Sequence, residues 1–273
     1  MMMAADTQIF RVGVVQMVSA PLVSENLIDA AKLIERAAGE GAQIIALPEY
    51  FAIMGLKDTD KVAARENFGS GPIQDFLREI SARLKVWLVA GSIPLVCEDP
   101  NKVRNTCLTL SDSGKIVARY DKIHLFQFAT DQERYAESRT IEPGNQVVML
   151  DSPFGKLGLS ICYDLRFPEL YRAMQGAGMI FVPSAFTETT GRAHWEILLR
   201  ARAIENQCYI VAPAQGGKHP SGRVTHGNSM VVDAWGTVLK RLDKGAGMFV
   251  MEIEMAALQS VRNRLPALGH RTL

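Results

Sequence analysis

Three residues that can together carry out nucleophilic acyl transfer stand at or near the ends of short apolar segments. Cys162 ends the segment 156–161, Glu49 ends the segment 42–48, and Lys122 follows another strand-like run. A thiol can attack a carbonyl carbon, a carboxylate can carry its proton, and an ammonium can stabilise the oxyanion. Strand ends that share a sheet edge converge on one crevice. We therefore expect a Glu–Lys–Cys catalytic group.

The surroundings of Cys162 favour a reactive thiol. An alternating apolar run before it predicts a strand, and Pro168 and Glu169 after it predict a helix start. A helix N-terminus and the Lys122 ammonium would both increase the thiolate fraction. Alternatives remain for each residue taken singly: a small buried apolar cysteine, a loop carboxylate at Glu49 and a solvated charge at Lys122.

Six segments in this order resemble the motifs of the nitrilase superfamily of carbon–nitrogen hydrolases. They are Leu47-Pro48-Glu49, Asp121-Lys122-Ile123-His124-Leu125, Ile161-Cys162-Tyr163-Asp164-Leu165-Arg166-Phe167-Pro168-Glu169, Ala193-His194-Trp195-Glu196, 200–207 and 229–236. The resemblance runs from about Phe10 to His270. Within the family, residues 200–215 most resemble the deaminated glutathione amidases. The omega-amidases, which act on 2-oxo acid amides, fit less well.

The resemblance implies an α/β fold, the four-layer α-β-β-α sandwich of this family. The sequence supports two sheets packed face to face with helices outside, because it predicts too many strands for one short sheet. We expect a single carbon–nitrogen hydrolase domain over 1–273, assembled as a homodimer or larger homo-oligomer. The tail of about 256–273 is either part of a subunit interface or a frayed end. Trp195, Leu198 and Leu199 form an apolar stripe that suits core packing or that interface.

The implied reaction is hydrolysis of a small carboxylate-bearing amide through a thioester at Cys162, with release of ammonia. Glu49 would move protons, while Lys122 and the backbone N–H of Tyr163 would stabilise the oxyanion. The family's second glutamate corresponds best to Glu137, with Glu133 and Glu142 as alternatives, and would hold Lys122. A surface charge in a polar loop is the competing interpretation of Glu137. A Cys–His pair using His124 is a further alternative.

Candidate substrate-binding residues come from the loops after strand ends. They are Tyr50, Phe51, Tyr163, Arg166, Phe186, Thr187 and Gln215. Arg166 could pair with a substrate carboxylate or form a structural ion pair with Asp164 or Glu169. Residues 127–134 replace the Asp-x-x-x-Pro-Gly of the amidase relatives, and 226–229 replace a Tyr-Gly-His-Ser pattern. Substrate identity is therefore less constrained than the chemistry.

Four functions compete. The preferred one is a deaminated glutathione amidase, followed by an omega-amidase acting on substrates such as 2-oxoglutaramate. A nitrilase would have Trp after the cysteine, where this chain has Tyr163. A catalytically silent interaction protein would not require Glu49, Lys122 and Cys162 together.

The composition argues against several classes of binding partner. The 273 residues are 48% hydrophobic and carry a net charge of +1, which gives no basic footprint for nucleic acid or membrane. No apolar run reaches the roughly 20 residues of a membrane span, and residues 1–6 lack the features of a signal peptide, so we expect a cytoplasmic protein. The four cysteines lack zinc spacing. Without a phosphate loop or dinucleotide motif, we expect neither metal nor cofactor.

The expected elements alternate between strand and helix. Ser24 is a candidate N-cap for a helix with Leu27, Ala31, Ile34 and Ala38 inward, and Pro72 opens a second helix. Further helices are expected over 168–175 and 193–206. Strands are expected over 12–18, 44–45, 86–96, 105–110, 115–120, 146–150, 157–162, 179–182, 208–212, 229–232, 238–242 and 248–253.

Overall fold

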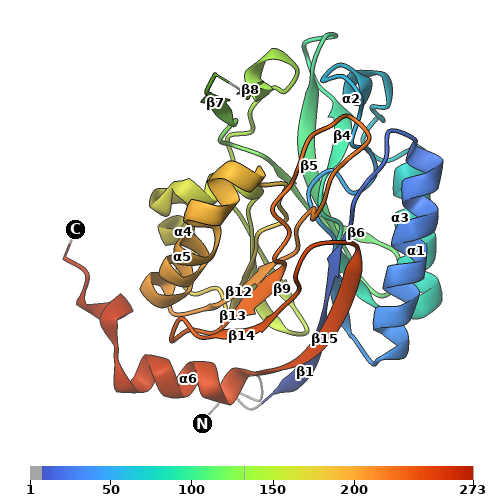
Figure 1. Ribbon diagram of the computed structural model, residues 1–273. Helices are drawn as coiled ribbons and strands as arrows, with labels where there is room; N and C mark the ends of the chain where they lie inside the picture. The colour runs from blue at the N-terminus through green and yellow to red at the C-terminus, as the bar shows by residue number, and fades with distance from the viewer. Residues whose placement is uncertain (1–7, 132, 273) are drawn as a thin grey trace.

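Two β-sheets pack face to face in the computed structural model, and helices cover the outer face of each (Figure 1). The structure describes residues 8–131 and 133–272. The first sheet has the strand order β15-β1-β2-β3-β5-β4, with β6 also paired to β5, and the second has the order β14-β13-β12-β11-β10-β9. Helices α1 and α3 flank the first sheet, and α4 and α5 flank the second. This confirms the predicted four-layer sandwich.

The element bounds follow the expected alternation closely. The strands are β1 (Ile9–Gln16), β2 (Ile44–Ala46), β3 (Trp87–Val89), β4 (Ile93–Val96), β5 (Val103–Leu110), β6 (Ile116–Asp121), β7 (Gln127–Ala129), β8 (Arg134–Ala136), β9 (Val148–Ser152), β10 (Gly155–Leu159), β11 (Met179–Phe181), β12 (Tyr209–Ala212), β13 (Met230–Val232), β14 (Val238–Arg241) and β15 (Gly247–Glu254). The helices are α1 (Val23–Gly39), α2 (Asp60–Ala63), α3 (Pro72–Leu84), α4 (Pro168–Ala173), α5 (Glu188–Asn206) and α6 (Met255–Arg264). Short 3₁₀ helices are η2 (Glu137–Arg139), η3 (Cys162–Arg166) and η4 (Ala267–His270).

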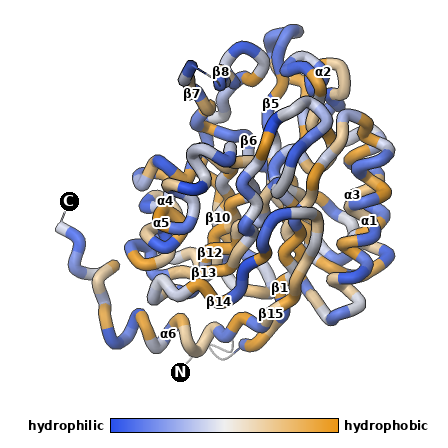
Figure 2. The backbone as a smooth tube through the Cα atoms, in the orientation of Figure 1, coloured by the Kyte–Doolittle hydropathy of each residue, from blue (hydrophilic) through white to orange (hydrophobic). Residues whose placement is uncertain are grey.

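Strand periodicity separates two cores. Val14 and Ala46 face the second sheet, while their neighbours Val15 and Ile45 face α1 and α3. Successive strand residues point to opposite faces, so a strand buried on both sides is apolar at every position. Figure 2 shows such apolar residues along β1, β10 and β12. The core between the sheets draws residues from both of them.

The parallel strands direct their ends to one edge. Strands β1, β2 and β3 are parallel to one another, as are β10, β11 and β12. Strand β6 is antiparallel to β5, which is antiparallel to β3, so β6 ends at the same edge as β3. Residues directly after β2, β6, β10, β11 and β12 therefore gather in one place.

Helix α1 has the predicted inward face but not the predicted cap. It begins at Val23 with Leu22 at the N-cap position, so the expected Ser24 cap is wrong. Ile34 is fully buried, and the predicted Leu27, Ala31 and Ala38 are partly buried against the same core. The sequence did not predict that Asn26 also turns inward, where its amide donates to the carbonyls of Ala20 and Ala52. The predicted start of α3 at Pro72 is confirmed.

Three further elements lay outside the sequence-based expectations. Helix α2, the β7–β8 hairpin and α6 were not predicted as such. Helix α5 begins at Glu188 rather than 193, because the hydroxyl of Thr187 accepts a hydrogen bond from the Thr190 N–H and caps it. In the tail, the guanidinium of Arg262 donates to the carbonyls of Gln207 and Ala177, so α6 is held to the fold.

The turn after β3 positions the segment that follows β2. Gly91 has a φ of +54°, and a Cβ at this position would overlap the carbonyl oxygen of Pro48. Pro48 directly precedes Glu49. This close approach of two backbones therefore requires glycine.

We predict that Gly91→Ala lowers the free energy of unfolding by about 2–5 kcal/mol, because steric overlap adds to left-handed strain. Gly176 is the matched control, since it has a φ of +97° and no atom within 4 Å of a built Cβ. Gly176→Ala should cost only about 1–2 kcal/mol. Urea unfolding of both variants measures the difference, and equal losses would contradict the steric argument.

Candidate active site

The structure brings the three predicted catalytic residues together at this edge. Glu49 follows β2, Lys122 follows β6, and Cys162 opens η3 just after β10. Their exposed fractions are 0%, 1% and 7%, so all three are buried. The Lys122 Nζ lies 2.8 Å from Glu49 Oε1.

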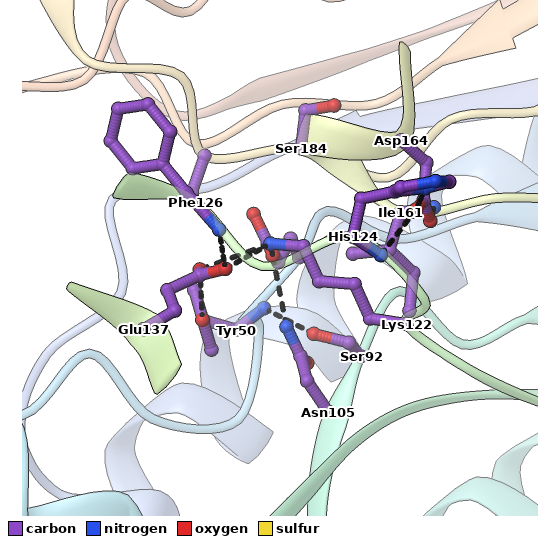
Figure 3. Close-up of polar contacts among 12 residues, drawn as sticks. Tyr50, Ser92, Asn105, Lys122, His124, Phe126, Glu137, Ile161, Asp164 and Ser184 are labelled. Atoms are coloured by element: carbon purple, nitrogen blue, oxygen red, sulfur yellow. Dashed lines mark hydrogen bonds and ion pairs between the residues drawn. The ribbon is translucent and has the colours of Figure 1, made fainter. Parts of the chain in front are cut away.

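Glu137 completes the charged group. Its Oε1 and Oε2 lie 3.0 and 2.8 Å from the Lys122 Nζ. The Tyr50 hydroxyl donates to Oε1 at 2.8 Å, and the Phe126 N–H donates to Oε2 at 2.7 Å, as Figure 3 shows. Of the alternatives to Glu137, Glu133 accepts from Thr189, and Glu142 pairs with Arg104. Glu137 is thus the candidate that contacts the lysine.

The two carboxylates keep Lys122 charged. Burial by itself lowers the pKa of Lys122, but Glu137 and Glu49 outweigh it and the net pKa shift is upward. Burial likewise raises the pKa of Glu137, yet Lys122 and the Phe126 N–H bring it below its ordinary value. Lys122 is therefore poorly suited to act as a base.

The thiol is not activated in advance. Burial raises the pKa of Cys162, and Glu49 and Glu137 raise it further, against the opposing effects of Lys122 and a backbone hydrogen bond from Ala185. Lys122 acts on the thiol in the expected direction, since it lowers the pKa of Cys162, but burial and the two carboxyl groups outweigh it. The surroundings as a whole therefore disfavour the thiolate.

One oxygen of the Glu49 carboxylate is left without a hydrogen bond. Glu49 Oε1 accepts from Lys122 and, at 2.9 Å, from the amide of Asn105. Glu49 Oε2 is buried and has no hydrogen-bond partner among the residues described. Buried polar atoms are nearly always paired, so this oxygen marks a place for a proton or a substrate atom. Asn105 was not predicted, although a polar residue inside a buried strand was a signal for it.

Two residues of the site adopt left-handed backbone conformations. Tyr50 has a φ of +56° and Cys162 a φ of +50°. Each costs of order 1–3 kcal/mol in a residue with a side chain. The Tyr50 N–H donates to Ser92 Oγ at 3.0 Å, and the Cys162 N–H donates to the Pro183 carbonyl at 2.9 Å. These bonds hold the strained turns in place.

Asp164 fixes the turn that carries the thiol. Its carboxylate accepts from the Tyr120 hydroxyl at 2.6 Å and the Ile161 N–H at 2.9 Å. It also accepts from the His124 N–H, and the His124 Nδ1 lies 2.7 Å from it. His124 is thus engaged with Asp164, and no hydrogen bond among the described residues joins His124 to Cys162.

Most of the predicted substrate-binding residues lie around the thiol. Tyr163, Arg166, Phe186 and Thr187 line a small cavity with Cys162, and Tyr50 lines a larger cavity beside it. The small cavity offers about 10 Å³, about enough for one water molecule. Substrate binding therefore requires some lining side chains to move.

Two of the predicted pocket residues serve other purposes. Phe51 is fully buried in the core beside α1 and α3. Gln215 donates to the Glu49 carbonyl and to Ser19 Oγ. They were misplaced because residues after strand ends can point away from the crevice.

Two arginines at the small cavity lack acidic partners. In the described ranges Arg166 forms no ion pair with Asp164, Glu169 or any other carboxylate, so the alternative of a structural ion pair is wrong. Its guanidinium contacts the rings of Tyr163 and Phe186. Arg223, which the sequence did not predict, lines both cavities. Arg223 lies in the loop between β12 and β13, whose sequence has no helix or strand periodicity from which its position could be predicted.

The described residues offer neither a metal site nor a membrane-spanning helix. No cluster of three or more His, Cys, Asp or Glu side chains there could hold a metal ion. No helix within 8–131 and 133–272 is long and apolar enough to cross a membrane.

Comparison with known proteins relates this geometry to one family. The carbon–nitrogen hydrolase family model matches residues 11–263. A deaminated glutathione amidase from Synechocystis sp. is 43% identical over 262 residues, covering 94% of this chain and 96% of that protein. Saccharomyces cerevisiae Nit3, a member of branch 10 of the nitrilase superfamily, superposes with a TM-score of 0.88 at 30% identity, covering 97% of each chain.

A third relative has a reactive cysteine. A mutant amidase from Nesterenkonia sp. AN1 carries acrylamide added to its active-site cysteine. Its TM-score is 0.75 at 29% identity, covering 94% of this chain and 98% of that one.

We predict that Lys122→Met destabilises the protein by about 3–5 kcal/mol at pH 7, because two buried carboxylates lose their cation. Adding Glu137→Gln to this variant should restore part of the loss by removing one of those charges. Urea unfolding of the single and double variants measures this coupling. A double variant whose loss of unfolding free energy equals the sum of the two single losses would contradict the coupling. Lys32→Met, which breaks an exposed pair with Asp29, is the control and should cost less than about 1 kcal/mol.

The pH dependence of this loss has a defined sign. The pKa of Glu137 is lower in the folded state than its ordinary value of 4.5. It therefore contributes stability that is present above pH 4.5 and is lost as the pH falls through the folded-state pKa. The difference in free energy of unfolding between the wild type and Lys122→Met should therefore narrow as the pH falls from 4.5 through the folded-state pKa of Glu137. A difference that stays constant with pH would contradict the ion pair as its source.

Proposed function

The chain belongs to the carbon–nitrogen hydrolase family, and from this premise we propose that it is an amidase acting on deaminated glutathione. The curated relatives with this activity support the substrate. The observation that carries the chemistry is the unpartnered Oε2 of buried Glu49, in a site that also holds the Cys162 thiol and the Lys122 ammonium. These three groups supply the base, the nucleophile and the positive charge that amide hydrolysis requires.

Acylation begins at Cys162. Its Sγ attacks the amide carbonyl carbon while the thiol proton passes to Glu49 Oε2. The Lys122 ammonium and the Tyr163 N–H stabilise the negative oxygen of the tetrahedral intermediate. Glu49 then returns the proton to the departing nitrogen, the carbon–nitrogen bond breaks, and a thioester remains on Cys162.

Deacylation uses the same carboxylate. Glu49 takes a proton from a water molecule, whose oxygen attacks the thioester carbon. Collapse of the second intermediate breaks the carbon–sulfur bond, and the proton on Glu49 returns to the thiolate. Glu137 touches none of the reacting atoms in this scheme. It acts by holding Lys122 in position and in its charged form.

The leaving group depends on the amide. From a primary amide such as 2-oxoglutaramate it is ammonia. In deaminated glutathione the same 2-oxo acyl group is joined to cysteinylglycine, so the departing amine is this dipeptide. Arg166, which has no carboxylate partner among the described residues and lines the cavity with Cys162, is the proposed partner of the acyl carboxylate.

Assembly and location belong to the same proposal. We propose one hydrolase domain that forms a homo-oligomer through the outer face of α5, where Ile197 and Ile204 are 67% and 49% exposed. Trp195 and Leu199 of the predicted stripe are instead buried within the chain, and Leu198 packs against the same core.

The four free cysteines support a cytoplasmic location, because a reducing compartment keeps thiols unpaired.

We predict that Cys162→Ala abolishes release of 2-oxoglutarate and cysteinylglycine from deaminated glutathione, because no nucleophile remains. Glu49→Gln should lower kcat by about 10²–10⁴, the usual contribution of a general acid–base group. Both products can be quantified by mass spectrometry, with circular dichroism showing that the variants are folded. Hydrolysis retained by folded Cys162→Ala would refute the mechanism.

Charged residues on α5 should disrupt assembly. We predict that Ile197→Lys combined with Ile204→Lys lowers the mass measured by light scattering to that of a monomer, because an apolar interface cannot bury unpaired charges. Ile28→Lys on α1, where Ile28 is 57% exposed, is the control and should leave the mass unchanged. A monomeric wild type would contradict the proposed oligomer.

A further inference from the structure

A cavity of about 540 Å³ lies beside the small cavity at the thiol. Two residues connect the two spaces. Tyr50 lines the larger cavity and donates its hydroxyl proton to Glu137 in the charged group. Arg223 lines both cavities. The two cavities are therefore neighbours that share Arg223 in their walls.

Lys61 contributes a positive charge to the lining of this cavity. Its side chain is half-buried, donates to Thr140 Oγ1 at 3.1 Å, and lies 5.6 Å from the centre of the Tyr50 ring. Across the described ranges its ammonium forms no ion pair. Burial lowers the pKa of Lys61, although Glu137 and Asp58 oppose this. Such an ammonium would gain from a nearby anion.

Arg223 adds a second cation without an acidic partner. Its Nη2 donates to the Ala185 carbonyl at 2.7 Å, and its guanidinium lies 5.3 Å from the centre of the Tyr135 ring. Its Nε is buried and unpartnered among the residues that the structure describes. Guanidinium groups are well matched to carboxylates.

The cavity as a whole favours anions. Its basic lining residues are Lys57, Lys61, Arg134 and Arg223, and its acidic ones are Asp58 and Glu133. The cations outnumber the acids, and one acid, Glu133, accepts a hydrogen bond from Thr189. An apolar or cationic ligand would leave the half-buried Lys61 and Arg223 without an anionic partner.

We propose that this cavity is the subsite for the departing amine, and that Lys61 and Arg223 bind a carboxylate on that amine. The inference rests on the proposed function and extends it to a substrate class: amides whose leaving amine ends in a carboxylate. Cysteinylglycine fits this class, since a dipeptide reaches about 7 Å from its nitrogen to its carboxylate. The ammonia released from a primary amide leaves the subsite unused.

The test compares two substrates that share one acyl group. The measured quantity is the ratio of kcat/KM for deaminated glutathione to that for 2-oxoglutaramate. Lys61→Met should lower this ratio at least about tenfold, the loss expected for one charge-assisted hydrogen bond. Lys61→Arg should keep it within about threefold, because the charge remains. Lys32→Met removes an exposed lysine on α1 and should not change the ratio.

A modified substrate isolates the carboxylate. With deaminated glutathione whose terminal carboxylate is converted to a carboxamide, wild-type kcat/KM should fall at least about tenfold. With this carboxamide substrate, Lys61→Met should lower kcat/KM little further, because the substrate no longer has the carboxylate that Lys61 would bind.

The outcomes separate the two proposals. Suppose that wild-type protein hydrolyses both substrates, and that Lys61→Met lowers kcat/KM for both by the same factor or changes neither value. The leaving-group subsite is then wrong, while the amidase proposal stands. If wild-type protein hydrolyses neither substrate, the proposed function fails and this inference fails with it.

Discussion

A buried ammonium held between two carboxylates is the constraint on which this site depends. Desolvating three charges is costly unless each finds close partners, and Lys122 meets both Glu49 and Glu137 within 2.8 Å. Burial and these two carboxyl groups raise the pKa of Cys162. Glu49 Oε2 is the one oxygen of its carboxylate that Lys122 and Asn105 leave free.

The two sheets must stay in register for this arrangement to work, because Glu49 and Lys122 come from one sheet and Cys162 from the other. Asp164 makes one tie, since it follows the thiol and accepts from Tyr120 on β6. Gln215, after β12, makes a second tie by donating to the Glu49 carbonyl. Bonds of this kind hold catalytic groups in productive geometry. Polar residues behind the site thus serve the chemistry indirectly.

The residues that the sequence could predict are those placed by strand periodicity. Glu49, Lys122 and Cys162 each follow a strand, and Glu137 was identified by resemblance to the family. Arg223 escaped prediction because irregular turns place it and give no periodic pattern. The inward turn of Asn26 on α1 escaped for another reason: hydrogen bonds to distant carbonyls decided it. Local pattern predicts elements well, but not polar contacts between loops.

The groups that this site leaves unpaired bear on the proposed substrate. Buried polar atoms rarely lack partners, yet Glu49 Oε2 and Arg223 Nε have none in the described part of the chain, and Lys61 has no counter-ion there. A site built around such groups discriminates strongly against a ligand that cannot satisfy them. An amide with carboxylates on both sides of the scissile bond would meet Arg166 on its acyl side and Lys61 on its amine side. A simple aliphatic amide would leave both cations unsatisfied, so the same catalytic group would act on it poorly.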